Sequence, residues 1–219
     1  MGAAGAGRGK RGHPAVANCG EAEANVRAGA DLSNAYVQKG DASSGVREAR
    51  EAVRLAPEQS EAQRTLARAY VFAGNRDAAA EAFQRAIALE PQRAQLYDEL
   101  GTVMVQQGKL ADAALQFEKA AALSPESLSP HLHLGVLREQ QEMFERAEPE
   151  LRRALRIDPA NAPAHYYLGR VLREQGKPDE AVVEFRAAVQ SQPDFPDALN
   201  ELGLLLQRSG DIELSLIHI

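Results

Sequence analysis

The chain has 219 residues, of which 44% are hydrophobic and 5% aromatic, with no tryptophan. This composition favours helices packed through small side chains over a sheet with a large aromatic core. The formal net charge of −6 argues against a nucleic-acid partner, and the single cysteine excludes an internal disulfide and a cysteine-based zinc site.

Residues 1–24 differ in composition from the rest of the chain. They are rich in glycine and alanine, and they lack the apolar core of a secretory signal. We expect a flexible tail here, because so many glycines leave little apolar surface to bury. No apolar run long enough to span a membrane occurs anywhere, which favours a cytoplasmic location.

A repeat of 34 residues organises the remainder of the sequence. Five prolines stand 34 residues apart: Pro57, Pro91, Pro125, Pro159 and Pro193. With each proline at repeat position 32, the units are 26–59, 60–93, 94–127, 128–161, 162–195 and a partial 196–213. Position 7 is leucine in all six units, from Leu32 to Leu202, and position 8 is always small.

Each unit is predicted to form two helices. Apolar and small residues at positions 4, 7, 8 and 11 mark one face of a helix over positions 1–14. Glycine at position 15 suits the left-handed turn that ends this helix. A second helix over positions 17–30 carries small residues at positions 20 and 27 and mostly Phe or Leu at position 24. Pro149 lies inside one such helix, where we expect a kink or a frayed turn.

These positions resemble the tetratricopeptide repeat (TPR) family, whose motif places Leu, Gly, Ala, Phe, Ala and Pro at positions 7, 8, 20, 24, 27 and 32. The segment 94–125 is similar to the motif at nearly every position, with Met104 replacing the usual tyrosine of position 11. The resemblance covers about residues 25–213. It implies an all-α fold, a right-handed α-solenoid of antiparallel helix pairs, with about five full repeats and the first helix of a sixth.

No residue pattern in the sequence predicts catalysis. There is no nucleophile motif and no phosphate-binding loop, so we predict that the chain is not an enzyme. His131 and His165 both occupy position 4 and could suggest a metal site. A large ring in a half-buried position explains them better, and neither a metal nor a cofactor is predicted.

The TPR resemblance implies a scaffold that binds a protein or peptide segment along its concave face. Side chains at positions 2, 5, 9, 12 and 13 of the first helices are expected to face this groove. The candidate groove residues are Arg64, Arg68, Asp98, Thr102, Val136, Tyr166, Arg170, Arg173 and Asn200.

One stripe of the groove stands out in the fifth unit. Tyr166, Arg170 and Arg173 are spaced by four and three residues, so they share one face of a helix. An aromatic ring beside two guanidinium groups could anchor an extended peptide through a carboxylate. The alternative is a solvated helix face whose charges only maintain solubility.

Two functions remain open. The first is a non-catalytic scaffold for a protein or peptide partner. The second is the recruiting or regulatory arm of a larger enzyme, such as a glycosyltransferase or sulfotransferase, whose catalytic domain lies outside this sequence.

The last residues depart from the repeat. Residues 214–219 do not continue the pattern and are expected to be non-native, which suggests that the sequence is truncated after about Glu213. The sixth unit would then lack most of its second helix. We expect Leu202, Leu205 and Leu206 to be poorly covered, which would permit self-association through this end.

Overall fold

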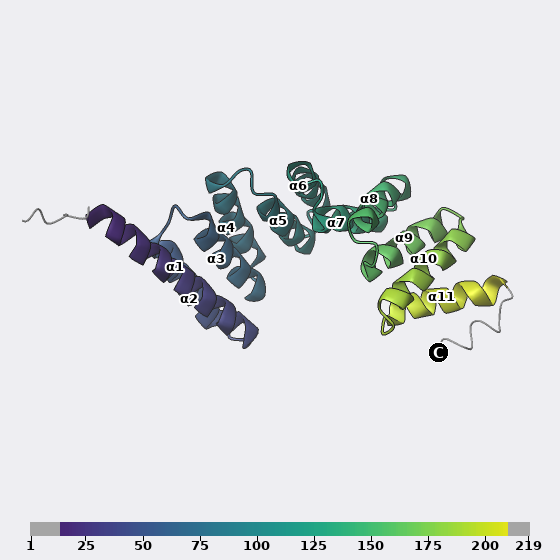
Figure 1. The fold of residues 1–219 in the computed structure, drawn as a ribbon, viewed down its shortest axis with the longest axis horizontal. Helices are drawn as coiled ribbons and strands as arrows, with labels where there is room; N and C mark the ends of the chain where they lie inside the picture. The colour runs from purple at the N-terminus through teal and green to yellow at the C-terminus, as the bar shows by residue number, and fades with distance from the viewer. Residues whose placement is uncertain (1–13, 210–219) are drawn as a thin grey trace, which may run out of the picture. The chain divides into compact units, whose positions relative to one another are not determined.

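The computed structural model describes residues 14–209, and within that range the chain forms eleven helices and no strand (Figure 1). The helices are α1 (Pro14–Gln38), α2 (Ala42–Leu55), α3 (Ser60–Phe72), α4 (Arg76–Leu89), α5 (Ala94–Gln106), α6 (Leu110–Leu123), α7 (Leu128–Gln140), α8 (Phe144–Ile157), α9 (Ala162–Glu174), α10 (Pro178–Ser191) and α11 (Pro196–Ser209). The predicted all-α solenoid of helix pairs is confirmed. The chain divides into two compact units, each made of more than one repeat. From here on, the first unit is Met1–Pro91 and the second unit is Gln92–Ile219, and the 34-residue units of the sequence are called repeats.

The helix boundaries follow the 34-residue repeat. The second helix of each repeat, from α2 to α10, spans positions 17–30 of that repeat. The first helices α3, α5 and α9 are followed by glycines in the left-handed region, with φ of 75° at Gly74, 77° at Gly108 and 75° at Gly176. Glu142 takes this role after α7 with φ of 58°, a conformation that glycine adopts at less cost.

Helix α1 extends further toward the N-terminus than the repeat requires. It begins at Pro14 and so includes residues 14–24, for which the sequence suggested a flexible tail. Proline is well suited to the first position of a helix, and alanines and glutamates follow it in this stretch. Residues 1–13 lie outside the described part of the chain.

Helix α8 passes through Pro149 without ending there. Pro149 is exposed and is the sixth residue of the helix, so the backbone bond that it cannot make involves a carbonyl of the first turn. The helix therefore does not fray at Pro149, and α8 has the same fourteen residues as α6 and α10. The expected kink stays a prediction.

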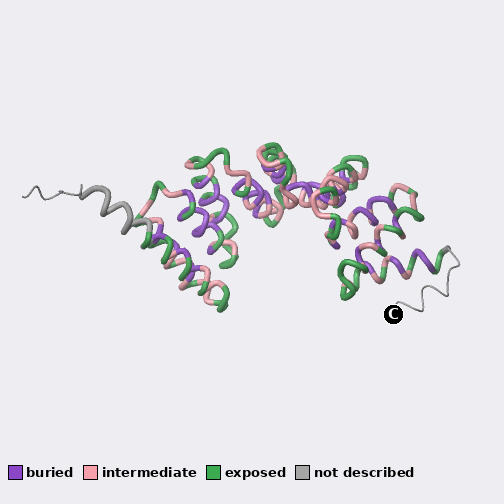
Figure 2. Tube along the Cα trace, in the orientation of Figure 1, coloured by how far each residue is buried: buried purple, intermediate pink, exposed green. Residues whose placement is uncertain are grey.

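Close packing between the two helices of a pair holds each repeat together. A Cβ atom built on Gly169 of α9 would lie 2.8 Å from the ring of Phe185 on α10, and one on Gly101 of α5 would lie 2.6 Å from Phe117 on α6. Both rings are buried, and the alanines at positions 20 and 27 of α4, α6, α8 and α10 are fully buried. Figure 2 shows the result, a buried side on each helix of the pair. The absence of a side chain at position 8 thus allows the ring of position 24 to fill the interface.

Successive pairs share the same core. In the second unit, Leu168, Val171, Leu172 and Phe185 form one buried cluster with the leucines of α11. Leu202, Leu205 and Leu206 are only 3%, 7% and 4% exposed. The expectation that these leucines are poorly covered is therefore wrong. The predicted break after Glu213 and the tail 214–219 lie outside the described residues.

The described helices also bear on membrane insertion: none of them is both long and apolar enough to cross a bilayer.

The packing at position 8 can be tested with one substitution at two equivalent sites. We expect Gly169→Ala to lower the free energy of unfolding by about 1–3 kcal/mol, because its methyl group would collide with a buried ring. Gly203 occupies the same repeat position in α11, and a Cβ there meets no atom of residues 14–209 within 4 Å. Gly203→Ala should instead raise the free energy of unfolding by up to about 1 kcal/mol, since alanine favours a helix. Urea unfolding of both variants decides the point, and equal effects at the two sites would contradict it.

Candidate functional site

The first helices of the second unit share one surface. Helix α5 contacts α7 and α7 contacts α9 directly, whereas the second helices α6, α8 and α10 are not paired with one another to this extent. Polar bonds between neighbouring first helices join side chains at positions 2, 5, 6, 9 and 12, so these positions lie on one continuous surface. We call this surface of α5, α7, α9 and α11 the inner face.

Asp98 connects α5 to α7. Its Oδ2 accepts a hydrogen bond of 2.6 Å from the Ser129 hydroxyl, and its Oδ1 lies 2.8 Å from Nδ1 of His133. The Thr102 hydroxyl donates to the Asp98 backbone carbonyl at 3.1 Å. Asp98 is only 9% exposed, and its contacts with Ser129 and His133 satisfy a carboxylate that burial would otherwise disfavour.

Serine, histidine and aspartate therefore meet on the inner face, as they do in many hydrolases. The geometry differs from a catalytic triad in one decisive respect. Ser129 donates directly to Asp98, and the same Nδ1 of His133 faces both partners, at 3.4 Å from the Ser129 oxygen. A triad needs one ring nitrogen for the serine and the other for the carboxylate. This cluster therefore serves to hold two helices together.

Glu139 and Arg170 connect α7 to α9. Nη2 of Arg170 lies 2.7 Å from Oε1 of Glu139, and the side chain of Glu139 is 4% exposed. The other oxygen, Oε2, is buried without a hydrogen-bond partner in the described structure. Burial raises the pKa of Glu139 above its ordinary value, and the positive charges of Arg170 and Arg173 only partly oppose this shift.

Arg173 connects α9 to α11. Its guanidinium forms ion pairs with Glu201 of α11 and with the neighbouring Glu174. Burial alone would lower the pKa of Arg173, but the hydrogen bonds that its guanidinium donates to these two carboxylates outweigh it and raise the pKa. Both arginines of the predicted stripe are thus neutralised by carboxylates of the same chain.

Aromatic rings form the surface beside these arginines. The Tyr166 ring lies 5.0 Å from the ring of Phe195 and 5.1 Å from that of Tyr167, measured between centroids. The Arg170 guanidinium lies 5.8 Å from the Tyr166 ring. Burial raises the pKa of the Tyr166 hydroxyl, and the nearby negative charge of Asp197 adds to the effect.

The predicted groove residues fall into two groups. Arg64 and Arg68 lie in the first unit, where Arg64 is buried and pairs with Glu61 at 3.1 Å, while Arg68 is exposed. The other seven lie on first helices of the second unit: Asp98, Thr102, Val136, Tyr166, Arg170, Arg173 and Asn200. Val136 is half-buried and Asn200 is exposed.

Sequence reasoning missed several participants of the inner face. They are Ser129, His133, Phe195, Asp197 and Glu201. Ser129 and Asp197 occupy position 2, which was expected to face the groove although neither residue was named as a candidate. His133 and Glu201 occupy position 6, next to position 5. The available signal was the alternation of opposite charges at neighbouring first-helix positions, such as Arg173 and Glu201.

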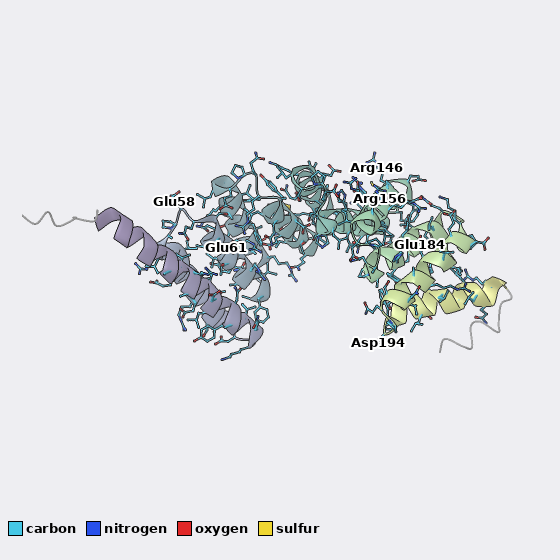
Figure 3. All side chains as sticks on the ribbon, viewed as in Figure 1. Glu58, Glu61, Arg146, Arg156, Glu184 and Asp194 are labelled. Carbon is cyan, nitrogen blue, oxygen red and sulfur yellow. The ribbon has the colours of Figure 1, made fainter. Side chains whose placement is uncertain are left out.

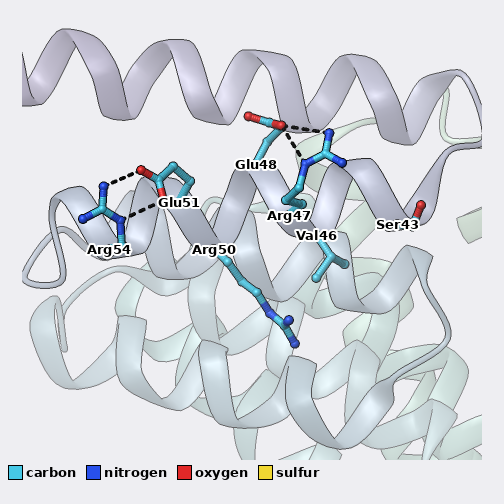
Figure 4. Close-up of a pocket in the computed structure, with 7 residues that line it drawn as sticks. All are labelled: Ser43, Val46, Arg47, Glu48, Arg50, Glu51 and Arg54. Atoms are coloured by element: carbon cyan, nitrogen blue, oxygen red, sulfur yellow. Dashed lines mark hydrogen bonds and ion pairs between the residues drawn. The ribbon is translucent and has the colours of Figure 1, made fainter.

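Two cavities differ in their relation to the inner face. One, of about 520 Å³, is lined by α2 alone (Figure 4). Its charges are largely paired among themselves, as in Arg54–Glu51 at 2.6 Å, and Arg50 donates to the Tyr70 hydroxyl at 3.0 Å. The other, of about 510 Å³, lies between α5 and the start of α7 and includes Asp98 in its wall.

The two histidines considered as metal ligands have other partners. Nδ1 of His131 lies 2.8 Å from Glu150, and Nδ1 of His165 lies 2.6 Å from Glu184. Glu184 belongs to α10 and is labelled in Figure 3. In each case Nε2 faces the carbonyl of the proline that ends the preceding repeat, at 3.1 and 3.0 Å. Each ring thus joins a helix pair to the turn before it. Among the described residues, no group of three or more His, Cys, Asp or Glu side chains is arranged to hold a metal ion.

Comparison with known families agrees with this architecture. Two profiles described as Tetratricopeptide repeat match residues 64–128 and 138–200, which together make up more than half of the chain. The chain belongs to the tetratricopeptide repeat family. The matched ranges include helices of both units, from α3 and α4 in the first unit to α9 and α10 in the second.

Solved structures of TPR proteins resemble this one in fold. PilF of Pseudomonas aeruginosa matches with a TM-score of 0.81 at 18% identity, covering 90% of each chain. PilW, described as a type IV pilus biogenesis factor, matches with 0.76 at 21% identity, covering 88% of this chain and 90% of its own. YrrB, described as a TPR protein with an unusual peptide-binding site, matches with 0.64 at 20% identity, covering 78% and 89%. No curated protein sequence gives a significant match.

The Glu139–Arg170 pair makes a pH-dependent prediction. We expect Arg170→Gln to lower the free energy of unfolding by about 1–3 kcal/mol at neutral pH, because it leaves a buried carboxylate unpaired. The raised pKa of Glu139 means that the unfolded chain loses this proton first, near its ordinary value of 4.5. Stability should therefore fall as pH rises above this value, and Arg170→Gln should deepen that fall.

The measurement is urea unfolding between about pH 4 and pH 8. Adding Glu139→Gln to the variant should recover most of the loss, since no buried charge then remains. Arg173→Gln is the control, because Glu201 is more exposed than Glu139 and its loss should be smaller. A loss for Arg170→Gln that is independent of pH would contradict the assignment.

Proposed function

We propose that this TPR chain is a non-catalytic scaffold whose inner face in the second unit binds a peptide or protein segment. The carrying observation is the set of side chains left available between the internally paired charges. Leu204 is 46% exposed, Asn200 is exposed, and Val136 is half-buried, all on first helices. An apolar side chain exposed beside polar groups is a common starting point for recognition of a partner.

The repeat aligns these side chains across the surface. Position 9 of the repeat is occupied by Thr102, Val136, Arg170 and Leu204 in the four repeats of the second unit. Neighbouring packed helices lie about 8–10 Å apart, and an extended chain advances about 3.3 Å per residue. One residue in three of a bound segment could therefore meet one side chain of this row.

The fold comparison supports the same function. YrrB, which shares the fold, is described as having a peptide-binding site. A second function, as the recruiting arm of a larger enzyme, would use the same surface to hold the substrate protein. The inner-face experiment therefore applies to both.

Substitutions on two faces of the second unit test the proposal. The inner variant combines Val136→Ser with Leu204→Ser. The control combines Leu115→Ser with Val183→Ser on α6 and α10, where the two side chains are 60% and 63% exposed. Each variant thus loses one valine and one leucine, and circular dichroism should show unchanged helix content in both.

Binders selected from a random peptide library against the full chain supply the probe, with affinity measured by calorimetry. We expect the inner variant to weaken binding about tenfold or more, because two apolar contacts are lost. The outer variant should bind as well as the unchanged protein. The proposal fails if the outer variant loses as much affinity as the inner one.

A further inference from the structure

The inner face near α9 and α11 has an excess of negative charge. Four carboxylates lie on or beside this surface, those of Glu139, Glu174, Asp197 and Glu201. Three guanidinium groups oppose them: those of Arg170, Arg173 and Arg208, the last at the repeat position that Glu174 occupies in α9. Arg170 and Arg173 are each already paired with a carboxylate of the chain. The sequence alone suggested that these arginines anchor a carboxylate of a partner. Their pairing within the chain leaves neither of them free for that role.

Asp197 carries a charge that the chain leaves available. It is exposed at the start of α11, and none of the described lysines or arginines forms an ion pair with it. Arg208 stands in the last turn of the same helix, eleven residues away along the chain. A positive group of a partner would thus find this carboxylate unoccupied.

Aromatic rings stand beside the same carboxylate. Asp197 acts electrostatically on Tyr166, whose ring lies 5.0 Å from that of Phe195 at an interplanar angle of 44°. Both rings are half-buried. The faces of tyrosine and phenylalanine attract cations, and they also cover the aliphatic part of a lysine or arginine.

We propose that the second unit selects a basic segment, with a lysine or arginine side chain placed between Asp197, Tyr166 and Phe195. This inference rests on the proposed function and specifies the chemistry of the partner. Arg170 and Arg173 act as positioning residues, which hold Glu139, Glu201 and the tyrosines in place.

The test uses three labelled peptides that differ only in charge. They share the same apolar residues and carry Lys, Gln or Glu at the same positions, and their affinity for the full chain is measured by fluorescence anisotropy. The Lys peptide should bind about tenfold or more tightly than the Glu peptide at low salt. Raising the salt concentration from about 50 to about 300 mM should reduce this difference.

Asp197→Lys is the decisive variant, and the chain offers a matched control for it. Asp179 also follows a proline at the start of a helix and is exposed, but it lies on the second helix α10. Asp179→Lys therefore causes the same change in net charge and in helix-terminus charge. We expect Asp197→Lys to lower the affinity for the Lys peptide about three- to tenfold, and Asp179→Lys to leave this affinity nearly unchanged.

Two results would overturn the inference alone. One is an equal or higher affinity for the Glu peptide, and the other is an equal effect of the two lysine variants, which would show a response to net charge only. In both cases the peptides would still bind more weakly to the inner variant, Val136→Ser with Leu204→Ser, so the proposed binding surface would remain supported. If none of the three peptides binds, or if that inner variant has no effect on them, both the inference and the proposed function fail.

Discussion

The contact between a residue without a side chain and a buried ring is the constraint on which this structure depends. At Gly101 and Gly169 the first helix approaches its partner so closely that even a methyl group would collide with Phe117 or Phe185. This approach buries the alanines of the second helix and directs one side of every first helix into the core. The opposite side is left to face its neighbours and the solvent. The inner face is thus a consequence of the packing inside each pair.

The polar bonds on the inner face act between pairs. Asp98 with His133, Glu139 with Arg170, and Arg173 with Glu201 each join one first helix to the next. Most of these groups are half-buried or buried, so removing one partner leaves the other poorly solvated. The same bonds remove most arginine charge from the surface. What remains for a partner is a row of apolar and polar side chains beside the carboxylate of Asp197, which forms no ion pair with the described lysines and arginines.

The repeat made much of this predictable from sequence. Leucine at position 7 recurs in every repeat, and glycine at position 15 and a large side chain at position 24 recur in most of them. They depend on geometry within one repeat, and the helix bounds and left-handed turns follow them closely. The pairing of Arg170 with Glu139 joins residues 31 positions apart on different helices, and no periodicity encodes which rotamers meet. The start of α1 and the burial of Leu202 depend on helix propensity and packing at the ends of the array, where the repeat pattern gives least information.

The central claim is that the inner face of α5, α7, α9 and α11 is the binding surface. The most direct test is to follow the backbone amide signals of the full chain by NMR while a selected peptide is added. The account predicts that the largest shifts occur on the first helices, around Val136, Arg170, Asn200 and Leu204. Shifts concentrated on α6, α8 and α10, around Leu115 and Val183, would contradict it.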